Sequence, residues 1–138
     1  MLKKLKKYVM TIQSMFKFVG NRIMDEADYI TESGELITDK GLWDYEVWKS
    51  GRQRVYGRLS VNCSPTGSVL GGYYYIYQME PPITFSKIYC VHADAYWGTG
   101  IALASARTWT AEQINITLLN NQKEASKAVI AITIEGMR

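Results

Sequence analysis

The 138-residue sequence predicts a mainly β fold, an antiparallel β-sandwich of the jelly-roll type, preceded by an N-terminal α-helical coiled coil. Three observations predict it. The apolar residues of the first segment repeat with heptad spacing, a polar stretch follows, and short runs rich in Val, Ile, Thr, Tyr and Trp fill the remainder. The predicted units are a stalk over 1–30, a connector over 31–40 and a sandwich head over 41–138.

The apolar positions of the first segment alternate between spacings of three and four residues, which is the a/d seam of a coiled coil. They are Leu2, Leu5, Val9, Ile12, Phe16, Val19 and Ile23. β-branched residues occupy two of the three d positions, Ile12 and Val19, and such residues at d favour three or four strands over two. The pattern therefore predicts a homotrimeric stalk with these seven side chains at the trimer interface.

Positive charge is concentrated in the same segment. Six basic residues precede the first acidic residue, Asp25, whereas the remainder holds ten basic and thirteen acidic residues. A basic amphipathic helix can lie on an anionic membrane, so a peripheral membrane-associating protein stays open as an alternative. Because the charge is confined to one helix and the head is mildly acidic, we expect a solvated helix face and no nucleic-acid partner. No uninterrupted apolar run follows the lysines, so neither a signal peptide nor a membrane span is expected.

The stretch TESGELITDKG, where the heptad period has ended, holds two glycines and several turn-forming residues, as connectors do. The strands expected after it are 42–48, 54–61, 72–79, 84–91, 100–106, 113–119 and 128–134. Several of them alternate apolar and polar residues, which indicates one buried face. The segment KEASKAVIAI also permits a helix, and this alternative stays open.

The head opens with GLWDYEVWKSGRQRVYG over 41–57, which contains the pattern G-x-W-x-Y-x-x-W-x-S-G followed by an aromatic residue and Gly. This block resembles the opening of a domain at the C-terminal ends of tail-fibre and minor structural proteins of bacteriophages and prophages. In that family Lys is common where Val47 stands here. Arg54 and Val55 replace the usual Glu and Cys, and Tyr56 replaces a Trp. The rest of the head, to residue 138, resembles the family only in its general β pattern.

The resemblance implies a β-sandwich head that trimerises at the tip of a fibre, contacts a host-surface glycan or protein receptor, and has no catalytic residues. The implied location is the virion, in a tail or fibre assembled with other virion proteins in the cytoplasm of the bacterial host. Neither enzymatic activity nor a cofactor is expected. A polysaccharide-degrading tail enzyme stays open as a second alternative, because carboxylates such as Glu80 and Glu112 can converge in the fold.

Three aromatic residues are the candidate receptor contacts. Tyr96 and Trp97 adjoin the turn-forming run Gly98-Thr99-Gly100, and Trp109 lies in the polar run RTWT, so all three are expected on loops. Flat rings pack on the apolar faces of sugars and keep a polar edge for hydrogen bonds. The predicted strand 72–79 is aromatic on both faces, which indicates burial between sheets on one side and against a neighbouring subunit on the other.

Conventional catalytic or metal signals are weak. His92 is the only histidine, and it shares a strand face with Asp94, where a surface hydrogen bond is expected; a metal or acid-base site would need a third partner. Cys63 and Cys90 form no CxxC pair, so neither a zinc site nor a disulfide framework is expected.

Overall fold

The structure, a computed structural model, describes residues 28–39, 41–69, 71–98, 101–121 and 126–138. The predicted stalk interface therefore lies outside the described residues, and the coiled coil stays a prediction. Its positions are Leu2, Leu5, Val9, Ile12, Phe16, Val19 and Ile23. Within the described ranges there is no helix long and apolar enough to cross a membrane.

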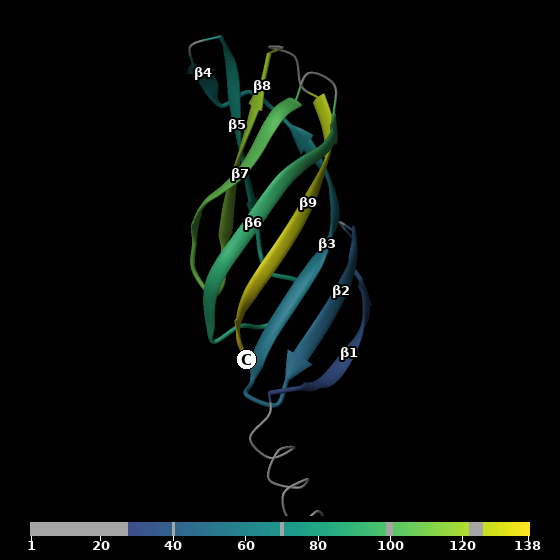
Figure 1. The fold of residues 1–138 in the computed structure, drawn as a ribbon. Helices are drawn as coiled ribbons and strands as arrows, with labels where there is room; N and C mark the ends of the chain where they lie inside the picture. Colours follow the sequence, from purple (N-terminus) through teal and green to yellow (C-terminus); the bar gives the residue numbers. More distant parts are fainter. Residues whose placement is uncertain (1–27, 40, 70, 99–100, 122–125) are drawn as a thin grey trace, which may run out of the picture.

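The described residues form nine strands in two antiparallel sheets (Figure 1). The strands are β1 (Ile30–Ile37), β2 (Gly41–Trp48), β3 (Arg52–Cys63), β4 (Gly67–Val69), β5 (Gly72–Met79), β6 (Lys87–Gly98), β7 (Ile101–Trp109), β8 (Ile114–Asn120) and β9 (Ser126–Met137). The five-stranded sheet has the order β1-β2-β3-β9-β6, and the four-stranded sheet has the order β4-β5-β8-β7. Four pairs of consecutive strands lie side by side and antiparallel, β1–β2, β2–β3, β4–β5 and β7–β8.

The core lies between the two sheets, where the predicted alternation places it. Val55, Leu59, Ile114, Ile130 and Ile134 are fully buried, and they come from one strand of the four-stranded sheet and two of the five-stranded sheet. The outward neighbours of these residues along each strand are exposed or half-buried, as the period of two requires. The prediction of a mainly β, two-sheet antiparallel head is therefore confirmed.

The predicted connector is wrong in one respect, because most of it is strand β1 at the edge of the five-stranded sheet. β1 pairs with β2 from Ile30 to Ile37 and buries only part of Leu36 against the core. β1 pairs on one side only and carries acidic residues on both of its faces, Glu32 on one and Glu35 on the other, so its sequence resembles that of a connector. The strand β4 escaped prediction because it is only three residues long.

The helical alternative for KEASKAVIAI is also wrong where the segment is described, since β9 begins at Ser126 and continues to Met137. Its alternating isoleucines lie at the centre of the core. Both long neighbours of β9 in the five-stranded sheet, β3 and β6, pair with it along most of its length. β9 is thus a central strand, and the pairing on both sides overrides the helix propensity of its alanines.

Candidate ligand-binding trough on the five-stranded sheet

Outward side chains of the five-stranded sheet align in rows across β2, β3, β9 and β6. The backbone register defines two adjacent rows, the first Asp44, Tyr56, Thr133 and His92, and the second Leu42, Arg58, Ala131 and Asp94. These eight residues, with the backbone at Gly57 and Ile132, line a hollow of about 500 Å³. We call this hollow the trough. Its volume lies in the range of about 300–1,000 Å³ that is typical of small-ligand sites.

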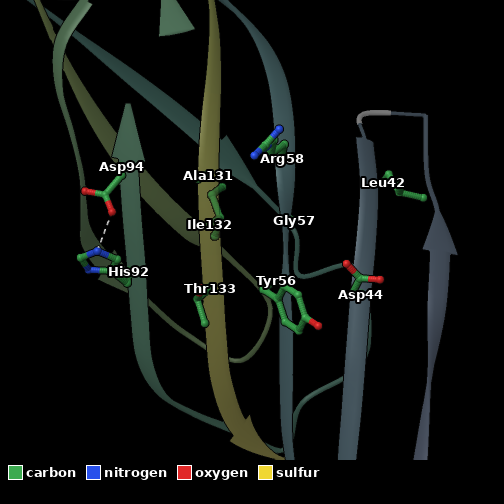
Figure 2. Close-up of a pocket in the computed structure, with 10 residues that line it drawn as sticks. All are labelled: Leu42, Asp44, Tyr56, Gly57, Arg58, His92, Asp94, Ala131, Ile132 and Thr133. Carbon is green, nitrogen blue, oxygen red and sulfur yellow. Dashed lines mark hydrogen bonds and ion pairs between the residues drawn. The ribbon is translucent and has the colours of Figure 1, made fainter. Parts of the chain in front are cut away.

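The trough exists because side-chain size changes from strand to strand. Figure 2 shows short side chains at Ala131 and Thr133 on β9, with His92 and Asp94 on one flank and Tyr56 and other residues of β3 and β2 on the opposite flank. Small residues on a central strand between longer ones on its neighbours leave a lane along that strand. The floor is the buried sheet itself, so the lane rests on a rigid support.

One flank of the trough is organised by a hydrogen bond. His92 Nε2 lies 2.7 Å from Asp94 Oδ2, and both side chains are largely exposed (Figure 2). The expected surface hydrogen bond between these two residues is confirmed. The described residues hold no group of three His, Cys, Asp or Glu side chains that could bind a metal ion.

A third row adjoins the trough toward the β2–β3 turn, and it contains an ion-pair network. Arg54 Nε donates to Glu135 Oε1 at 2.8 Å, and the Arg54 guanidinium also lies 3.9 Å from Glu46. The same guanidinium and that of Arg52 lie over the ring of Trp48. The Arg54 cation is therefore neutralised locally by two carboxylates. This row separates the trough from the end of the sandwich where β2 turns into β3.

The expected loop position of the three aromatic candidates is wrong. Tyr96 and Trp97 belong to β6, in which Trp97 pairs with Val129 of β9 and the register shifts between Ala95 and Trp97. Trp109 is the last residue of β7 and packs partly buried against the core. Gly98 is the last residue of β6, so the strand continues through Tyr96 and Trp97 up to the glycine. These residues are therefore strand positions.

Trp97 and Trp109 also lie at opposite ends of the sandwich. β6 ends at Gly98 and β7 begins at Ile101, so Trp97 lies close in sequence to the start of β7, whereas Trp109 is the last residue of the nine-residue β7. Eight residue steps of a strand span about 26 Å. The backbone positions of Trp97 and Trp109 thus exclude one small saccharide contacting both.

We expect Trp109→Ala to lower the free energy of unfolding by about 1–3 kcal/mol, because the indole ring packs partly buried against the core. Tyr89→Ala is the matched control, since Tyr89 is more than half exposed and its loss should change stability by about 0.5 kcal/mol at most. Urea unfolding followed by circular dichroism measures both. An unchanged stability of Trp109→Ala together with lost cell binding would restore Trp109 as a receptor contact.

Glu80 and Glu112, far apart in sequence, line one hollow of about 630 Å³ formed by the 80–86 loop and the β7–β8 turn. Both carboxylates are exposed. The general acid of a glycosidase commonly sits in an apolar, desolvated pocket, which differs from this setting. The structure therefore brings the two candidate acids to one region, at exposed positions.

The four-stranded sheet presents a different outer face, which we call the uncharged face. Its outward residues on β5, β8 and β7 are Tyr74, Ile76, Gln78, Asn115, Thr117, Leu119, Leu103, Ser105 and Thr108. None of these described positions carries a charge, and Leu103 and Ile76 are among the most exposed apolar side chains. Arg107, on the edge strand β7, lies at a register irregularity beside this face. On the opposite side of β5, Tyr75 is buried in the core, as its alternation predicts.

Two solved fibre structures match this chain in a comparison of structures. A P. aeruginosa R1 pyocin fibre matches with 13% identity over 77% of this chain, with a TM-score of 0.49, and the match spans only 28% of that fibre chain. An N-truncated R1-type pyocin tail fibre matches with 14% identity over 86% of this chain and 94% of that chain, with a TM-score of 0.52. No protein-family model and no curated protein sequence matches the chain. At these identities the likeness to the N-truncated tail fibre shows a shared fold.

Proposed function

We propose that this chain is the receptor-binding head of a phage or prophage tail fibre, a virion structural protein that attaches to a host-surface receptor without catalysing a reaction. The observation that carries the proposal is the two-sheet antiparallel head, which shares its fold with a pyocin tail fibre over 86% of the chain. A fold alone hosts many functions. Two surface features therefore add to the proposal, the trough on one sheet and the uncharged face on the other.

Homotrimerisation is part of the proposal and is supported by two separate parts of the chain. The heptad seam from Leu2 to Ile23 favours three or four strands by its β-branched d positions. The uncharged face places exposed Leu103 and Ile76 where no charge would have to lose water on contact with another subunit. We propose that three heads pack through these faces around the axis of the stalk, so that the three troughs face outward.

The virion location and the other tail proteins as partners follow from the same proposal. Assembly in the reducing cytoplasm of a bacterial host suits the exposed free thiol of Cys90. A thiol in that compartment needs no partner cysteine. The head then acts by binding alone. Its affinity for a dense surface comes from multivalency, because three weak sites on one fibre bind far more tightly than one.

We expect the fluorescently labelled full chain to bind a subset of strains in a panel of Gram-negative and Gram-positive bacteria, saturably and with more than ten-fold differences among strains. Flow cytometry measures the binding, and unlabelled protein should compete. Binding to no strain, or equally to all strains, would contradict the proposal. Breakdown of isolated surface polysaccharide that is abolished by Glu80→Gln or Glu112→Gln would contradict its non-enzymatic part.

A further inference from the structure

The two outer faces of the sandwich differ in charge, and the trough on the five-stranded sheet has polar groups on both flanks. We propose that the trough is the receptor site of the head and that it takes a neutral or amino-bearing saccharide and rejects anionic ones. This inference rests on the proposed function, whose binding site it locates and whose ligand class it names.

The width of the trough suits one carbohydrate chain. β3 and β6 flank β9 on either side, so their backbones are two strand spacings, or about 10 Å, apart. Ala131 and Thr133 are the short side chains in the lane between them. A single sugar chain lying along β9 would contact both flanks at once, and the sheet beneath would hold those flanks in place.

The side chains at the trough are those that recognise hydroxyl-rich rings. Asp44 and Asp94 carry carboxylates that accept hydrogen bonds from sugar hydroxyls, and Thr133 can both donate and accept. The His92 bond uses one oxygen of Asp94, Oδ2, which fixes the carboxylate and leaves its second oxygen for a ligand. The ring of Tyr56, 39% exposed, supplies a flat apolar surface for stacking.

Charge decides the ligand class. We count the charges on the outward residues of three rows, the two trough rows and the adjoining row, each extended to β1. They comprise five carboxylates and two guanidinium groups, which gives a net charge of −3 with His92 neutral. The carboxylates belong to Glu35, Asp44, Glu46, Asp94 and Glu135, and the guanidinium groups belong to Arg54 and Arg58.

Carboxylates outnumber the two guanidinium groups around the trough. Arg54 is paired with Glu135 and Glu46, and Arg58 lines the trough together with Asp44 and Asp94. The lane is about 10 Å wide, so a charge on the ligand would lie within about one Debye length, 8 Å at physiological salt, of both flanks. A uronate or phosphate would therefore be repelled, whereas an ammonium group would be attracted.

The test is an array of bacterial surface glycans sorted into neutral, amino-bearing and anionic classes, probed with the full chain and followed by calorimetric titration of the best binder. We expect binders only in the first two classes. Tyr56→Ala should weaken the best binder at least ten-fold by removing the stacking surface. Asp94→Asn should weaken amino-bearing glycans more than neutral ones. Added salt should do the same, because only charge attraction is screened.

Tyr89→Ala is the matched control, an exposed tyrosine of the same sheet outside the trough, and it should leave binding unchanged. Binders confined to the anionic class, or no binder in any class, would overturn the assignment of the ligand. Strains bound equally by the wild type, Tyr56→Ala and Asp94→Asn would overturn the trough as receptor site while the proposed function stands. Failure of the wild type to bind any strain would instead sink the proposed function. Circular dichroism of each variant confirms that the fold persists.

Discussion

Replacing Trp43 with Ala is expected to lower the free energy of unfolding by about 3–5 kcal/mol, the usual loss for a fully buried large aromatic. Trp43 is 1% exposed, and its indole Nε1 donates to Thr38 Oγ1 at 3.3 Å. Its ring also lies across Gly57 of the neighbouring strand, where an added Cβ would come within 2.9 Å of ring atoms. The variant would leave a cavity directly beneath the trough. We therefore expect both a lower stability in urea unfolding and weaker ligand binding at the trough.

The same strand supplies the control. Trp48 faces outward at the end of β2, half-buried beneath Arg52, whose guanidinium lies 4.3 Å from the ring centre. Its replacement by Ala should cost only about 1 kcal/mol, since a partly exposed cation–π contact contributes little more. Equal losses for Trp43→Ala and Trp48→Ala in urea unfolding would show that the burial pattern of β2 is not as described.

Burial could be predicted from the sequence wherever a strand has one apolar face. Val55 and Leu59, Ile114 and Ile116, and the isoleucines of β9 alternate with residues that are smaller or more polar, and the hydrophobic effect turns each such set inward. Edge strand β1 could not be found in this way, because Glu32, Ser33 and Glu35 give it no apolar face. Its order comes from hydrogen bonds to β2, which depend on β2 already being in place.

The candidate site could be predicted only in part. The sequence places His92 and Asp94 on one strand face, and the structure confirms their hydrogen bond. It could not show that Tyr56 and Asp44 lie across β9 from them, because that neighbourhood depends on β9 inserting between β3 and β6. Strand order is a long-range property that local patterns do not encode. The sequence did hold one signal for Tyr56 and Asp44: each is an aromatic or polar residue at an outward position of a strand with clear alternation.

The proposed trimer contact and the proposed receptor site use opposite faces of the sandwich. A face without charges loses little solvation energy when another subunit covers it, whereas the ion-paired, acidic face would lose much more. Burying the uncharged face in the proposed trimer would therefore leave the trough in solvent. Three strands of seven to nine residues form a small contact area, below what stable interfaces usually need. We therefore expect the heads to depend on the predicted stalk, which would hold them at high local concentration.

The largest effect on assembly is expected from combining changes in the two proposed interfaces. The double variant Ile12→Asp and Val19→Asp would bury charges against their symmetry copies in the stalk, and Leu103→Glu would place a charge on strand β7 of the uncharged face. Ser60→Glu is the matched control, an exposed position on the outer face of the opposite sheet. Light scattering and sedimentation at micromolar concentration measure the mass of each full-length protein.

We expect the wild type and Ser60→Glu to be trimers, the stalk variant to associate at least ten-fold more weakly, and the combined variant to be a monomer. Leu103→Glu alone should remain a trimer through its stalk but lose cross-linking between heads, because the charge disrupts only the face contact. A monomeric wild type would refute the trimer. If the stalk variant and the combined variant associate equally strongly, the uncharged face is not part of the interface. Strong binding of a monomeric wild type to anionic liposomes, lost in a variant with its N-terminal lysines neutralised, would favour the peripheral membrane alternative instead.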